Sequence, residues 1–138
     1  MTARYLLPLR WPLVLGAVFA LLAVVAGAFG AHGLRAMVSE RGLEVFQTGA
    51  TYQMYHSLAL IVSALLAGFG LSRRLLALAA ALFTVGIVLF SGSLYLLVLT
   101  DTPALGAITP MGGLCFIAGW ALLVAAGLGS TARKEEST

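Results

Sequence analysis

Long apolar runs, separated by short polar stretches, dominate the pattern of this 138-residue chain. A helix needs about 20 consecutive, predominantly apolar residues to cross the hydrocarbon core of a bilayer. Four runs are long enough: residues 11–31, 52–71, 75–99 and 107–128. The pattern therefore predicts four transmembrane helices, which together form a single membrane domain over residues 1–138.

The first run has some features of a cleaved signal peptide. It follows an arginine-containing start and ends among small residues. The apolar region of a signal peptide, however, is only about 7–15 residues long. Because this run is longer, we expect it to be retained as the first transmembrane helix.

The polar connections favour antiparallel neighbours. The second and third runs are joined by Ser72, Arg73 and Arg74, and so short a loop forces the two helices to run in opposite directions. Pro110 suits the first turn of the fourth helix. The fold class predicted by these features is all-α, an integral-membrane antiparallel four-helix bundle.

The longest polar segment, residues 34–51, separates the first two runs. Ser39 could cap a short helix that carries Leu43, Val45 and Phe46, because a serine side chain accepts hydrogen bonds from a first helical turn. We expect this short interfacial helix to lie at the membrane surface between the first two spans.

Small residues gather on one side of the first and fourth runs. At 100° per residue, Gly16, Gly27 and Gly30 share a side of the first run, and Gly112 and Gly119 share a side of the fourth. Small residues let helix backbones approach closely in lipid. We therefore expect these five glycines at helix contacts. Trp120 falls on the other side of the fourth run and is expected to turn away from the bundle.

Composition agrees with a membrane protein. Hydrophobic residues make up 61% of the chain and charged residues 9%, whereas an ordinary soluble domain is about a quarter charged. A soluble domain of this length could not bury so much apolar surface. The net charge of +3 does not indicate a nucleic-acid partner, because the cations lie at the ends of the apolar runs. The single cysteine, Cys115, cannot form an internal disulfide.

The cations also predict an orientation. With four spans, both termini and the second loop share one side of the membrane. That side holds Arg4, Arg10, Arg73, Arg74, Arg133 and Lys134, and the other side holds Arg35 and Arg41. Cytoplasmic flanks of transmembrane helices are enriched in lysine and arginine. Both termini are therefore expected in the cytoplasm.

A group of polar side chains falls near the outer ends of the predicted helices. It contains His32, Tyr52, Gln53, His56 and Tyr95. An ionisable group at membrane depth is a functional hypothesis by default, so these residues form the candidate polar site. We expect His56 to be buried in the bundle and bonded to Tyr52 or to a hydroxyl of the third helix.

Several chemistries remain open for this group. Polar residues often hold membrane helices together, which is the structural alternative. His56 could carry protons near pH 7, but no acidic residue lies within a span. His32 and His56 could ligate haem, but the chain has no His-x-x-x-His or Cys-x-x-Cys spacing, so we predict no cofactor and no metal. No phosphate loop or nucleophile elbow is present, so the sequence favours a protein that is not an enzyme.

Four motifs carry a family resemblance. They are GAFGAHGL at residues 27–34, YQMYHSLAL at 52–60, GSLY at 92–95 and ITPMGG at 108–113. In this order they resemble the YgdD-like family of small membrane proteins, whose vertebrate relatives are also small transmembrane proteins. The resemblance implies a multi-pass protein of the bacterial inner membrane with no established biochemical activity. It implies no catalytic or binding residues.

Two functional hypotheses follow. The first is a membrane scaffold or accessory protein that binds lipid, a partner membrane protein or further copies of itself. The second is a carrier or binder of a small molecule, a proton, or a metal or haem, through the polar site around His56 near the outer face.

Overall fold

The structure is a computed structural model that describes residues 7–135, with side chains through residue 129. Its long helices are α1 (Arg10–His32), α2 (Glu40–Leu66), α3 (Arg73–Leu99) and α4 (Thr109–Glu135). The short 3₁₀ helices η2 (Leu34–Ala36), η3 (Ala67–Phe69) and η4 (Pro103–Ala107) lie in the connections. All four long helices are long and apolar enough to cross a membrane. The predicted four-helix membrane bundle is confirmed.

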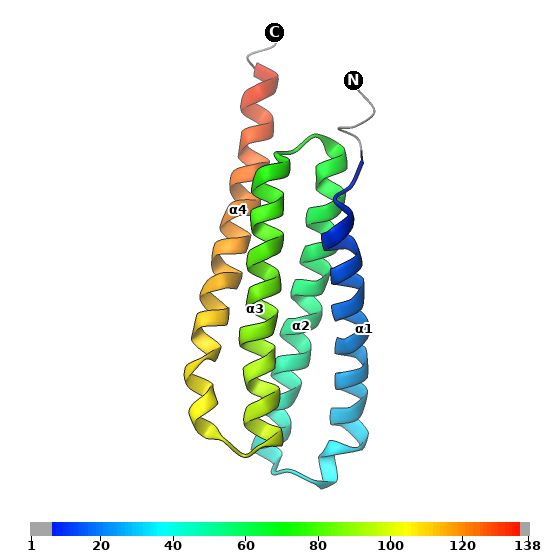
Figure 1. Cartoon of the computed structure of the whole chain (residues 1–138), viewed down its shortest axis with the longest axis vertical. Helices are drawn as coiled ribbons and strands as arrows, with labels where there is room; N and C mark the ends of the chain where they lie inside the picture. Colours follow the sequence, from blue (N-terminus) through cyan, green and yellow to red (C-terminus); the bar gives the residue numbers. More distant parts are fainter. Residues whose placement is uncertain (1–6, 136–138) are drawn as a thin grey trace.

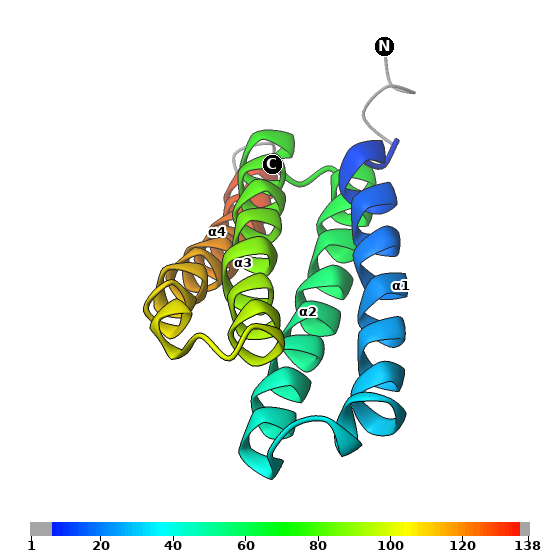
Figure 2. The same ribbon diagram turned by 60° about the horizontal axis from the view of Figure 1, so that its bottom comes forward.

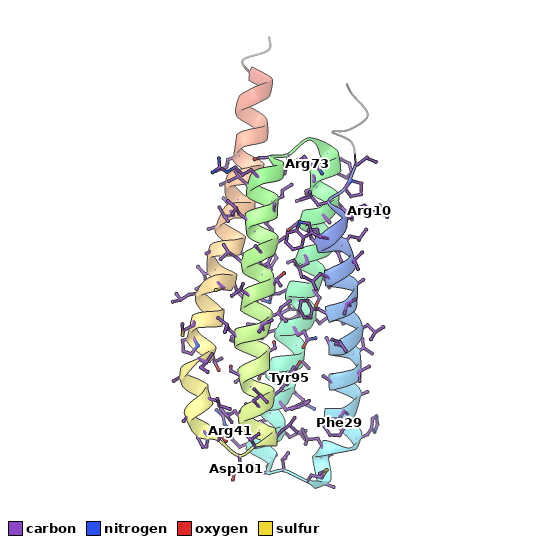
Figure 3. All side chains as sticks on the ribbon, viewed as in Figure 1. Arg10, Phe29, Arg41, Arg73, Tyr95 and Asp101 are labelled. Atoms are coloured by element: carbon purple, nitrogen blue, oxygen red, sulfur yellow. The ribbon has the colours of Figure 1, made fainter. Side chains whose placement is uncertain are left out.

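The helices follow one another in space as they do in sequence. In Figure 1 they stand side by side in the order α1, α2, α3, α4, and each packs chiefly against its neighbours in the chain. The tilted view of Figure 2 shows the same order. α1 begins and α4 ends at the same end of the bundle. Figure 3 places Arg10 and Arg73 near that end, and Arg41 and Asp101 at the opposite end.

The second helix begins earlier than predicted, at Glu40 instead of residue 52. Ser39 caps it as expected, because its hydroxyl accepts a hydrogen bond from the Gly42 amide at 3.0 Å. The capped segment does not form a separate interfacial helix, and that expectation is wrong. Its residues continue unbroken into the span because Phe46 is buried and Gly49 packs against the Tyr95 ring.

The core is built from small side chains around a few aromatic rings. One apolar cluster joins α2, α3 and α4 through Ala59, Leu60, Ala79, Ala80, Phe83, Ile87 and Phe116. Alanine side chains are small, so they allow the helices to approach closely. Close packing matters here because lipid tails are as apolar as the side chains and give no hydrophobic force between helices. A smaller cluster of Ala67, Leu76 and Ala126 lies toward the end at which the chain begins and finishes.

Four of the five glycines expected at helix contacts lie against a neighbouring helix. A Cβ added to Gly16 would lie 2.8 Å from the Ser57 carbonyl oxygen, and one added to Gly30 would lie 3.2 Å from the Phe46 ring. A Cβ on Gly112 would lie 2.8 Å from the Phe90 Cβ, and one on Gly119 would lie 2.6 Å from the Phe83 ring. A Cβ at Gly16, Gly112 or Gly119 would force the neighbouring helix to shift, whereas a Cβ at Gly30 requires only that the Phe46 ring give by a few tenths of an ångström.

Gly27 differs from this expectation. A Cβ added there would meet no atom within 4 Å. α1 packs chiefly against α2, so its buried line is narrow and passes through Gly16, Ala23 and Gly30 at seven-residue spacing. Residues that recur every seven positions stay on the side of a helix that faces one neighbouring helix. Gly27 falls beside this line.

Candidate functional site

The predicted polar residues do not form one site. Gln53 and His56 are both buried on α2, but they face different neighbours. Gln53 bonds to α1 and α3, whereas His56 bonds to α4. His32, the last residue of α1, is exposed and lies with neither group. The candidate site is therefore two separate hydrogen-bond groups on α2.

Gln53 links three helices. Its Nε2 donates to the Phe19 carbonyl oxygen of α1 at 2.8 Å, and its Oε1 accepts from the Tyr95 hydroxyl of α3 at 2.7 Å. Tyr95 is visible on α3 in Figure 3, and its ring packs on Phe46 with centroids 4.8 Å apart. A glutamine amide has both donors and an acceptor, so one side chain can satisfy partners on two helices.

Replacing Gln53 should loosen this three-helix contact. In Gln53→Leu the Tyr95 hydroxyl loses its acceptor in a partly buried position. An unsatisfied buried polar group costs about 1–3 kcal/mol, so we expect a lower melting temperature in detergent. Gln47→Leu is the matched control, because Gln47 is exposed on the same helix. Equal melting temperatures for the two variants would contradict the structural role of Gln53.

His56 lies in an aromatic group between α2, α3 and α4. Its ring stacks on Phe116, with centroids 3.4 Å apart and planes inclined by 7°. His56 Nδ1 lies 2.7 Å from the Tyr52 carbonyl oxygen, and His56 Nε2 lies 3.1 Å from Trp120 Nε1. An indole nitrogen can only donate, so Nε2 accepts and Nδ1 carries the proton that binds the carbonyl. The geometry thus assigns a neutral imidazole with both nitrogens engaged.

The partners of His56 differ in part from the expectation. Tyr52 contributes its carbonyl, but the third helix contributes no hydroxyl to His56. Tyr95 donates to Gln53, and Ser91 donates to the Gly49 carbonyl oxygen at 2.7 Å. Trp120 was predicted to turn away from the bundle, and this is wrong for the indole nitrogen, which binds His56. Trp120 is 46% exposed, and an indole can present its ring to lipid while its N–H binds inward.

Further hydroxyls join neighbouring helices toward the end of the bundle that carries Arg41. Ser93 of α3 and Thr109 of α4 share a hydrogen bond of 2.7 Å. Sequence alone cannot identify the carbonyl or hydroxyl that each serine of α3 meets. In the part of the chain that the structure describes, every buried side-chain nitrogen and oxygen has a hydrogen-bond partner. Over the same residues, no three His, Cys, Asp or Glu side chains are grouped to hold a metal ion.

A groove of about 510 Å³ opens between α2 and α4 at the end that carries Arg41, and we call it the α2–α4 groove. Its walls and floor are formed by Arg41, Glu44, Val45 and Thr48 of α2, Phe90 and Leu94 of α3, and Thr109 of α4. Tyr52, one turn beyond Thr48, stacks on Phe90 with centroids 4.7 Å apart. The groove therefore combines charged groups and hydroxyls with aromatic and apolar side chains.

Comparison with known proteins places the chain in a family. A family model described as "Protein of unknown function (DUF423)" matches residues 26–113, which include all four motifs noted in the sequence. The UPF0382 membrane protein YwdK of Bacillus subtilis is 50% identical over 114 residues, covering 83% of this chain and 93% of that protein. The UPF0382 membrane protein SERP0230 of Staphylococcus epidermidis is 48% identical over 116 residues, covering 84% and 93%.

No solved structure matches the chain. The predicted membership in a family of membrane proteins of unknown function is confirmed, and kinship with the YgdD-like proteins stays a prediction. On the match to residues 26–113 and the identity to its relatives, the chain belongs to the DUF423 family of membrane proteins.

Proposed function

We propose that this protein is a membrane accessory protein that holds a bilayer lipid in the α2–α4 groove. One observation carries the proposal, which is that charged, hydroxyl and apolar side chains line the same groove. Arg41 and Glu44 provide charges, Thr48 and Thr109 provide hydroxyls, and Phe90 provides an apolar floor. A phospholipid has a group to match each kind of side chain, namely a charged headgroup, a polar linkage and an acyl chain.

The hydrogen bonds of the buried polar groups support a structural use of His56 and Gln53. Both nitrogens of His56 are engaged, and both ends of the Gln53 amide are engaged. A carrier of protons or a metal through His56 would have to break the bond to Tyr52 or to Trp120. Under the proposal these side chains fix the positions of the helices, and the groove that they shape binds the ligand.

The proposal includes an orientation in the bacterial plasma membrane. Relatives named as membrane proteins support the location, and the excess of lysine and arginine at the end where α1 begins supports cytoplasmic termini. The α2–α4 groove would then open toward the outer leaflet.

Cysteine labelling tests this orientation. In a Cys115→Ser background, Met37→Cys places a thiol in the exposed connection between η2 and α2. We expect a membrane-impermeant maleimide to label this thiol in intact cells, and to label a cysteine appended after Thr138 only in opened cells. The reverse pattern would contradict the orientation.

Lipid addition to the delipidated protein tests the function. A ligand at about 100 times its Kd stabilises the folded state by about 2.7 kcal/mol, so added phospholipid should raise the melting temperature. Thr48→Trp should abolish the rise because the indole fills the groove. Thr51→Trp is the matched control, since Thr51 is exposed on the same helix and does not line the groove. The same rise in both variants would contradict binding in the groove.

A further inference from the structure

The charges at the mouth of the α2–α4 groove are of both signs. Arg41 Nη1 and Glu44 Oε2 lie 3.3 Å apart, and the two side chains are 82% and 62% exposed. Arg41 also lines a neighbouring hollow of about 590 Å³, which is lined by Asp101 as well. One cation and two carboxylates therefore border this region, which makes it a poor receptor for a purely anionic group.

The ion pair itself contributes little to the fold. Exposed salt bridges contribute little to stability, because water screens the charges and ordering the two side chains costs entropy. Arg41 also lies in the first turn of α2, where the helix dipole disfavours a cation. Arg41 and Glu44 can therefore give up their contact with each other and bind a ligand with little loss of folding stability. Both side chains are free to serve as ligand-binding groups at the mouth of the groove.

We propose that the groove selects a zwitterionic phospholipid whose headgroup carries a free primary ammonium, the phosphatidylethanolamine class. Arg41 binds the phosphate, because a guanidinium offers several N–H donors to phosphate oxygens. Glu44 accepts hydrogen bonds from the ammonium. A trimethylammonium headgroup has no N–H to donate, and an anionic headgroup has no cation for Glu44. This inference rests on the proposed lipid-binding function and specifies its ligand.

Headgroup competition tests the selectivity. The full-length delipidated protein in detergent is mixed with equimolar phosphatidylethanolamine, phosphatidylcholine and phosphatidylglycerol that have identical acyl chains. Native mass spectrometry then counts each bound lipid. We expect phosphatidylethanolamine to exceed each of the others by about threefold, the scale of one exposed charge contact.

Two variants separate the roles of the charges. Glu44→Gln should abolish the preference for phosphatidylethanolamine over phosphatidylglycerol while total binding persists. Arg41→Gln should reduce the binding of all three phospholipids. Both positions are exposed, so circular dichroism should confirm that both variants fold.

The outcomes distinguish this inference from the proposed function. Equal binding of the three lipids, or a preference for phosphatidylglycerol, would overturn the headgroup selectivity and leave lipid binding intact. A dimer that binds no lipid would place a second copy at the groove and overturn both proposals. Preference unchanged in Glu44→Gln would also overturn the assigned role of Glu44.

Discussion

Gly112→Ala should strongly destabilise the protein, because it separates α4 from α3. The added methyl group would contact the Phe90 main-chain nitrogen and lie 2.8 Å from the Phe90 Cβ. Main-chain atoms of α3 cannot rotate away as a side chain can, so α4 has to move. Overpacking typically costs about 1–3 kcal/mol, and we expect the upper part of that range in a detergent unfolding experiment.

The adjacent glycine provides a matched control. A methyl group added at Gly113 would meet no atom within 4 Å. Both substitutions gain the higher helix propensity of alanine, which is worth about 1 kcal/mol in a helix interior. The difference between Gly112→Ala and Gly113→Ala therefore isolates the helix contact. Equal stability of the two variants would contradict the close approach of α3 and α4.

His56→Leu should produce the second large effect. Leucine keeps much of the volume but removes the acceptor of the Trp120 indole and the ring that stacks on Phe116. The hydrocarbon part of a lipid or detergent has no hydrogen-bond acceptor, and a donor left unsatisfied away from water costs about 1–3 kcal/mol. We expect a corresponding loss of stability in detergent, measured against Tyr55→Leu, because Tyr55 is 57% exposed on the same helix.

A glutamine at position 56 tests the cause of this loss. The amide oxygen of glutamine can accept a hydrogen bond from the Trp120 indole. His56→Gln should therefore recover part of the stability, and in a Trp11→Phe background the fluorescence of Trp120 should report the difference between the two variants. Leucine and glutamine variants of equal stability would show that the hydrogen bond does not support the fold.

The apolar pattern was sufficient to predict the four helices, because each span must satisfy its backbone internally in lipid. It could not locate the beginning of α2. Residues 40–51 have a weak apolar pattern, and their helix is held by contacts of Phe46 and Gly49 with distant residues. Such contacts are known only once the neighbouring helices are placed.

The burial of Gln53 and His56 could be predicted, but their partners could not, and His32 and Tyr52 are exposed. Helical spacing gives the angle of a side chain around its own helix, and it placed Gln53 and His56 inside the outer part of the bundle. It does not say which helix each of them faces. Trp120 was assigned to the outside because helical spacing puts it on the side of its helix away from Gly112 and Gly119, although its N–H binds His56. Gly27 was expected at a helix contact because helical spacing does not show how narrow a strip of α1 packs against α2.

The lipid retained after mild extraction from membranes tests most directly whether the α2–α4 groove holds a lipid. Native mass spectrometry should find one phospholipid on each chain of the wild-type protein and of Thr51→Trp, and none on Thr48→Trp. Retention of the same lipid by Thr48→Trp, in which the groove is filled, would contradict the account.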